Sequence, residues 1–129
     1  MRCSWLPVLP LLALPGALPA QAPDSLPPGV SAAMVEDGKK LYAGAGICSA
    51  CHGPDGKGTP GLGANLTDAE WVHSDGSYDA IVRQILQGVS AEKSTTGAAM
   101  PPKGGSQLTE AQVRAVAAYV WTLRRARPR

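Results

Sequence analysis

The apolar residues of the chain follow the period of an α-helix most regularly in residues 77–87. Within that range they recur at spacings of three and four and form one stripe, made by Tyr78, Ile81, Val82, Ile85 and Leu86. Gly88 follows the stripe, at a position where glycine commonly ends a helix. The pattern therefore predicts an amphipathic helix with one face packed against the protein core.

A second helix is predicted near the C-terminus, where polar residues mark its beginning. Thr109 and Gln112 have the spacing of a capping box, and Leu108 with Val113 has the spacing of a hydrophobic staple. The predicted buried face of this helix consists of Val113, Val116, Ala117, Val120 and Trp121.

A third helix is predicted in residues 33–46, with a weaker pattern that starts at Val35. Glu36 and Asp37 would lie near the positive end of its dipole. Two long segments rich in glycine, proline and small polar residues are predicted to be loops: residues 53–70 and 89–107. No segment has a strand pattern of similar strength, so we predict an all-α fold with about three main helices.

The first 22 residues differ in composition from the rest of the chain. Arg2 is followed by an uncharged apolar stretch, residues 6–20, which is 15 residues long and contains four prolines. A membrane-spanning helix needs about 20 apolar residues, so the pattern predicts a cleaved signal peptide over residues 1–22 rather than an anchor. Cleavage is expected after Ala22, with Ala20 as the alternative. We therefore expect an exported, periplasmic protein.

The remaining residues suffice for one small domain. We expect a flexible lead-in over residues 23–32, a folded domain over residues 33–124 and a basic tail over residues 125–129. The net charge of +2 gives no indication of nucleic acid binding. The sequence has no phenylalanine, and its only tryptophans after the predicted signal peptide are Trp71 and Trp121. The side chains alone therefore make a small hydrophobic core, to which a large apolar cofactor can add buried surface.

The segment Cys48-Ser-Ala-Cys51-His52 carries the most specific chemistry in the sequence. Two thiols at this spacing can add to the two vinyl groups of one haem, and the histidine that follows can bind the iron. The segment therefore predicts one covalently attached haem c, with Cys48 and Cys51 as attachment sites and His52 as an iron ligand.

Three other uses of this segment are open alternatives. A thiol oxidoreductase would place the cysteine pair at the start of a helix that follows a strand, and the chain has no strand pattern. A zinc site needs four ligands, and beyond the segment only His73 and carboxylates are available after the signal peptide. A structural disulfide would leave His52 unexplained. Haem attachment is the favoured interpretation.

Met100 is the leading candidate for a second iron ligand on the opposite face of the haem. It is the only methionine after Cys48, and the two prolines that follow it restrict the backbone. Met34 is a weaker candidate because it precedes the helical pattern. His73 is the main rival and would give a lower reduction potential. The alternatives are core packing for a methionine and a solvated loop position for His73.

Over about residues 35–123, the chain resembles the class I cytochrome c family. The shared features, in order, are a helix with Gly38 and Tyr42, the segment Cys48 to His52, Asn65-Leu66-Thr67, Met100-Pro101 and a final helix with Tyr119. The resemblance implies a small cytochrome c fold, with about three main helices wrapped around one covalently bound haem. It also implies that the first and last helices cross at Gly38, with Tyr42 and Tyr119 packed beside the crossing.

Three features look most like the short haem domains of terminal oxidase subunits: residues 65–71, the helix after Gly76, and Met100 ahead of Gln107-Leu108-Thr109. One position departs from the family, because Ala64 stands where proline is common. The proline usually offers its backbone carbonyl to the far nitrogen of the ligating histidine. An alanine carbonyl can also accept this hydrogen bond from His52.

Together these features predict a periplasmic one-electron carrier, not an enzyme, with haem iron ligated by His52 and Met100. One alternative is a haem c subunit or domain partner of a respiratory oxidase or dehydrogenase complex. A less favoured one is a haem enzyme or gas sensor with a labile sixth ligand. The expected partners are redox proteins, with no nucleic acid and no membrane span after signal cleavage. Lys57, Lys93 and Lys103 are expected to border the haem edge and to favour an acidic partner, unless they only aid solubility.

Overall fold

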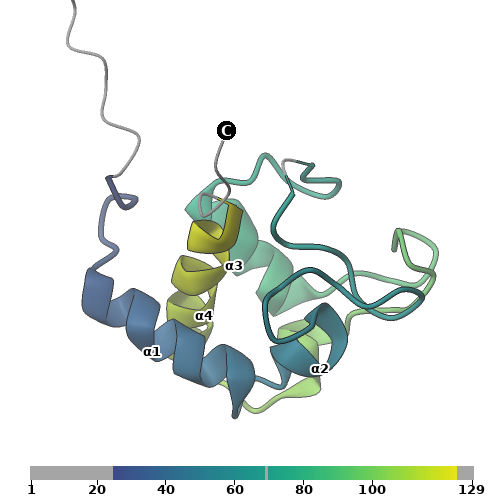
Figure 1. Cartoon of the computed structure of the whole chain (residues 1–129), viewed down its shortest axis with the longest axis horizontal. Helices are drawn as coiled ribbons and strands as arrows, with labels where there is room; N and C mark the ends of the chain where they lie inside the picture. Colours follow the sequence, from purple (N-terminus) through teal and green to yellow (C-terminus); the bar gives the residue numbers. More distant parts are fainter. Residues whose placement is uncertain (1–24, 69, 125–129) are drawn as a thin grey trace, which may run out of the picture.

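Helices make up the regular structure of the domain (Figure 1). The computed structural model describes residues 25–124, with the exception of residue 69. The helices in this part of the chain are α1 (Ala32–Ala43), α2 (Cys48–His52), α3 (Tyr78–Gln87), the 3-10 helix η1 (Pro102–Gly105) and α4 (Glu110–Leu123). Strand-like pairing within the same residues is limited to two isolated bridges, Thr59 with Gly63 and Val89 with Met100. The predicted all-α fold is confirmed.

The predicted signal peptide of residues 1–22, its two cleavage positions and the basic tail of residues 125–129 lie outside the described residues. Among the residues that are described, no helix is both long and apolar enough to cross a membrane. The structure therefore bears on the folded domain and on the last part of the predicted lead-in.

Hydroxyl side chains cap the N-terminal ends of the three longer helices. Ser31 accepts a hydrogen bond from the backbone N–H of Met34 at 3.2 Å, and Ser77 accepts one from the amide three residues later at 3.4 Å. At α4 the predicted capping box is present: Thr109 accepts from the Gln112 amide at 3.3 Å, and the Gln112 side chain accepts from the Thr109 amide at 2.9 Å. These bonds satisfy N–H groups that a helix cannot pair internally.

Both ends of α1 differ from the prediction. The Ser31 cap starts the helix at Ala32, inside the predicted lead-in, so Met34 lies in the first turn and Glu36 lies beyond it. The predicted position of acidic residues at the positive end of the dipole is therefore wrong. At the other end, Gly44 caps the helix after residue 43, because its N–H donates to two carbonyls of the last turn. The spacing of apolar residues did not reveal this cap, because Ser31 lies four residues before Val35, where the predicted pattern starts.

Helices α1 and α4 cross at close range, which the absence of a side chain at Gly38 permits (Figure 1). Gly38 is buried, and a Cβ atom there would overlap the carbonyl oxygen of Ala115 on α4. Beside the crossing, the rings of Tyr42 and Tyr119 meet edge to face, with centroids 5.3 Å apart. These contacts confirm the roles that the resemblance implied for Gly38, Tyr42 and Tyr119.

The core lies where α4 packs against both α1 and α3. Its buried members are mostly branched or small, namely Tyr42, Ile81, Val82, Ile85, Leu108, Val113, Val116, Ala117 and Val120. In Figure 1, α2 and the loop after it lie to one side of this group of helices. Several core residues of α3 and α4 also line a cavity that lies between these helices and α2 with its following loop.

Candidate functional site

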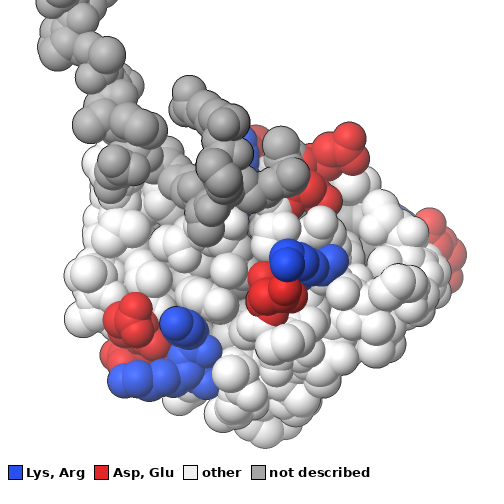
Figure 2. Space-filling view, in the orientation of Figure 1, with Lys and Arg blue, Asp and Glu red and all other residues white. Residues whose placement is uncertain are grey.

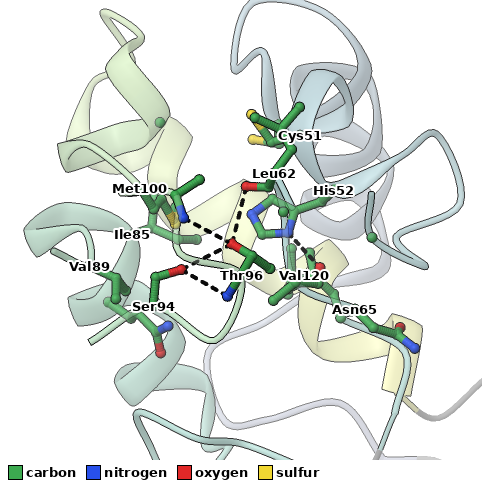
Figure 3. A pocket seen from close by; sticks show the side chains of 18 of the residues that line it. Cys51, His52, Leu62, Asn65, Ile85, Val89, Ser94, Thr96, Met100 and Val120 are labelled. Atoms are coloured by element: carbon green, nitrogen blue, oxygen red, sulfur yellow. Dashed lines mark hydrogen bonds between the residues drawn. The ribbon is translucent and has the colours of Figure 1, made fainter. Parts of the chain in front are cut away.

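The four residues predicted to hold the haem line one cavity of about 460 Å³. One wall comes from α2 and the loop of residues 53–73, and the other comes from α3, α4 and residues 89–104. Figure 3 shows His52 and Met100 on opposite sides of this cavity. Its volume lies within the range of about 300–1,000 Å³ that is usual for ligand and cofactor sites.

The single turn of α2 carries both cysteines of the cavity wall. Cys48 begins the helix and Cys51 lies three residues later, a spacing that puts two side chains on one helical face. Both thiols are free and half-buried, and burial raises the pKa of Cys48. The Cys48 Sγ donates a hydrogen bond to the carbonyl of Gly46 at 3.4 Å. Two thiols so placed on an apolar wall can both reach one flat ring system.

Gly63 packs directly on the cysteine segment, a contact that sequence reasoning missed. A Cβ atom at Gly63 would overlap the carbonyl group of Cys51. The bridge to Thr59 keeps Gly63 in place, with reciprocal backbone hydrogen bonds of 2.9 and 3.0 Å. The abundance of glycine in this loop is visible in the sequence, but it does not indicate which glycine faces the cysteines.

The backbone of the same loop orients His52. Its Nδ1 lies 2.8 Å from the carbonyl oxygen of Ala64. Because a carbonyl only accepts hydrogen bonds, the shared proton must be on Nδ1, which leaves the lone pair of a neutral imidazole on Nε2. In this tautomer Nε2 is able to bind iron. Ala64 thus supplies the expected carbonyl without the proline ring.

A short antiparallel bridge holds Met100 on the opposite wall. The amide of Val89 donates to the carbonyl of Met100 and the amide of Met100 donates back, both at 2.8 Å. Gly88, with a φ of 72°, packs so closely on this carbonyl that a Cβ atom would overlap it. Pro101 then leads in an extended conformation into η1. The backbone on both sides of Met100 is therefore constrained.

The two rival ligands are placed less favourably than Met100. Met34 belongs to α1 and is not part of the cavity lining. His73 is exposed and lines both the rim of the cavity and a neighbouring polar hollow. Within residues 25–124 apart from residue 69, no group of three or more His, Cys, Asp and Glu side chains is placed to hold a metal ion. The geometry therefore favours Met100 over Met34 and His73.

Two residues that line the cavity each have a buried polar atom with no hydrogen bond partner within the described protein. The atoms are Nε1 of Trp71 and Oε1 of Gln84. An indole N–H can only donate, and a buried donor without a partner costs about 1–3 kcal/mol. The cavity itself has an apolar lining that suits the ring of a haem, formed by Leu66, Ile81, Ile85, Val116 and Val120. The residues present therefore fit a haem.

Exposed apolar side chains border the same cavity. The large apolar residues that are exposed in the described part of the chain are Ile47, Leu62 and Val72, at 52%, 45% and 62% exposure. All three line the cavity. Ile47 also has a φ of 59°, which is unfavourable for a β-branched residue. An apolar rim of this kind is typical of a surface that contacts another molecule.

Two of the three lysines expected at the haem edge line the cavity. They are Lys57 and Lys103, whereas Lys93 lines the neighbouring hollow. Lys57 pairs with Asp55 at 3.0 Å, so part of its charge is balanced. Figure 2 shows the same tendency on the visible face, where charged side chains are sparse and several lie beside a charge of opposite sign. Electrostatic attraction of a partner should therefore be modest.

Tyr42 makes a testable contact behind the site. Its hydroxyl donates to the carbonyl of Gly53 at 2.8 Å, directly after His52, and burial holds the pKa of Tyr42 well above its ordinary value. At pH 8, Tyr42→Phe should lower the free energy of unfolding by about 1 kcal/mol. Because the pKa of Tyr42 is higher in the folded protein, its contribution to the free energy of unfolding is fully present below about pH 10. It is lost as the pH rises further, because the tyrosine ionises in the unfolded chain and stays neutral in the folded one.

The stability gap between the two proteins should therefore shrink by about 1 kcal/mol between pH 8 and pH 11. Denaturant unfolding at both pH values measures this difference. A gap of the same size at both would contradict the role of burial at Tyr42.

Several known proteins with similar sequences are subunits of cbb3-type cytochrome c oxidases. Residues 33–120 match the family described as cytochrome C oxidase, cbb3-type, subunit III. The cbb3-type cytochrome c oxidase subunit CcoP of Rubrivivax gelatinosus is 37% identical over 87 residues, which are 67% of this chain and 25% of that protein. The cbb3-type subunit FixPc of Rhizobium leguminosarum bv. viciae is 40% identical over 77 residues, which are 59% of this chain and 26% of that protein. The chain spans about a quarter of the length of these curated relatives.

A solved structure has the same fold. Cytochrome CL from the marine methylotrophic bacterium Methylophaga aminisulfidivorans superposes with a TM-score of 0.54 at 23% identity, over 70% of this chain and 53% of that one. This likeness supports the fold alone and confirms the predicted small cytochrome c fold. The predicted resemblance to haem domains of oxidase subunits is also confirmed. Because the family match covers more than half of the sequence, the chain belongs to the cytochrome C oxidase, cbb3-type, subunit III family, whose cytochrome c domain carries covalently bound haem c.

Proposed function

We propose that this domain is a one-electron carrier in which Cys48 and Cys51 attach the haem and His52 and Met100 ligate its iron. The observation that carries the proposal is that these four side chains, from two walls, line one cavity. When bound, the haem supplies an iron that alternates between the ferrous and ferric states.

The placement of two candidate ligands supports electron transfer as the role of that iron. His52, oriented by the carbonyl of Ala64, and Met100, constrained by Val89, would ligate the iron from opposite walls. Ligation by both side chains would leave no open site on the metal for a substrate or a gas, which supports electron transfer without conversion of a substrate. The apolar lining would exclude water from the ring of the haem.

We infer that the domain delivers electrons in the periplasm to a membrane-bound respiratory oxidase. Its relatives are named as subunits of cbb3-type oxidases, and the predicted signal peptide would export the chain. The apolar rim of Ile47, Leu62 and Val72, with Lys57 and Lys103 nearby, suits a small docking surface with a weakly acidic partner.

The mature protein provides a direct test of axial ligation. The ferric form should show the weak far-red absorption band of iron–methionine ligation and should bind cyanide slowly. The ferrous form should be reoxidised by a purified cbb3-type oxidase, with a rate that falls moderately as salt screens the surface charges. A spectrum without the far-red band, together with rapid cyanide binding, would refute the assignment as a carrier.

Native membranes distinguish a stable subunit from a free carrier. Co-purification of the haem protein with an oxidase at high salt indicates a stable subunit. Release by salt indicates a weakly bound carrier. Recovery of all of the protein without an oxidase, combined with no electron exchange, would refute the proposed partner.

A further inference from the structure

Two loops meet at the rim of the cavity, one from each wall, and Thr96 joins them. Residues 59–63 form a tight turn and residues 89–100 form a longer loop, and a backbone bridge closes each at its base. On the longer loop, the Thr96 hydroxyl lies 3.5 Å from the carbonyl oxygen of Leu62 on the turn. Figure 3 shows this hydrogen bond between the two walls.

The hydroxyl of Thr96 uses its whole hydrogen-bonding capacity. A threonine hydroxyl has one proton to donate and two lone pairs that accept. The proton goes to Leu62, and the Ala98 amide donates to one lone pair at 3.4 Å. The Ser94 hydroxyl lies 3.0 Å from that of Thr96, and Ser94 donates in this contact whenever the Thr96 proton is directed to Leu62; Ser94 also accepts from the Thr96 amide at 3.2 Å. This network orders the loop and directs the Thr96 proton to the opposite loop.

Each loop also leads to one of the proposed iron ligands. Two residues after Leu62, the carbonyl of Ala64 orients His52. Four residues after Thr96 the longer loop ends at Met100, where the backbone bridge begins. The hydrogen bond therefore joins the loop that orients His52 to the loop that ends at Met100. If it broke while the two bridges remained, the rim would open locally without unfolding of the domain.

We propose that Thr96 is a positioning residue that holds the two loops together and slows the entry of small ligands at the Met100 side of the haem. This inference rests on the haem site of the proposed function. It concerns how fast an external ligand reaches the iron, whereas the proposed function concerns which side chains ligate it.

The matched variants are Thr96→Val, which removes the hydroxyl and keeps the shape, and Thr96→Ser, which keeps the hydroxyl. Thr95→Val makes the same change at the exposed neighbour. On the ferric holoprotein, cyanide should bind Thr96→Val about fivefold faster than wild type, as expected for loss of one hydrogen bond. Hydrogen exchange of the backbone amides of residues 94–98 should accelerate by a similar factor. Thr96→Ser and Thr95→Val should stay within about twofold of wild type. Thr96→Val should lower the free energy of unfolding by no more than about 1 kcal/mol, which is the contribution of that one hydrogen bond.

Equal cyanide rates for Thr96→Val and wild type would overturn the inference, as would an equal acceleration by Thr95→Val. Unchanged exchange at residues 94–98 would overturn it as well, because the loops would then be held by other contacts. Rapid cyanide binding and a missing far-red band in the wild type would instead refute the proposed axial ligation. In that case the exchange rates, which need no axial ligand, still decide whether Thr96 holds the loops together.

Discussion

Gly38→Ala is expected to lower the free energy of unfolding by about 2 kcal/mol and the unfolding midpoint by about 8 to 16 °C. Helix propensity alone predicts the opposite sign, since alanine is about 1 kcal/mol better than glycine inside a helix. The helix crossing overrides this preference, because the added Cβ would overlap the carbonyl oxygen of Ala115. Overpacking costs about 1–3 kcal/mol and occasionally more, and a backbone obstacle cannot rotate away as a side chain can.

Lys39→Ala is the matched control for this change. Lys39 is the exposed neighbour of Gly38 on α1, so its replacement should alter stability by less than about 0.5 kcal/mol. Denaturant unfolding of the holoproteins, followed by far-ultraviolet circular dichroism, measures both variants. A Gly38→Ala protein as stable as wild type would mean that α1 and α4 can separate at little cost.

Met100→Ala is expected to abolish the far-red band and to lower the reduction potential by about 0.1–0.3 V, within the range of about 0.8 V over which axial ligands adjust haem potentials. The thioether sulfur favours the ferrous state, so its loss favours the ferric state. The vacated position should also make cyanide binding fast. The fold should persist, because the bridge between residues 89 and 100 uses backbone atoms only.

Two other replacements test whether the effect belongs to Met100. Met34→Ala changes a methionine on α1 away from the cavity, and His73→Ala removes the rival at its rim. Both variants should retain the far-red band and should keep the potential within about 0.05 V of wild type. Loss of the band in His73→Ala, or its survival in Met100→Ala, would reject ligation by Met100. Redox titration followed by absorbance gives both measurements.

Short windows of sequence were sufficient to predict α3 and α4. Apolar stripes and capping boxes act over three or four residues, so their structural consequence is local. The bounds of α1 could not be predicted in this way, because its Ser31 cap lies ahead of a weak apolar pattern. The helix η1 was also missed. It contains Lys103 with a φ of 57°, and such a turn leaves no apolar periodicity to detect.

The residues of the cavity show the same difference between local and long-range features of the sequence. The spacing from Cys48 to His52 is covalent and local, so the sequence identified groups that are able to attach a haem and to bind its iron. The backbone support of those groups is not local. Gly63 meets Cys51 across a loop, and Thr96 meets Leu62 from 34 residues away. A glycine or a hydroxyl has many potential partners in an aperiodic loop, and only the folded path of the chain selects one of them.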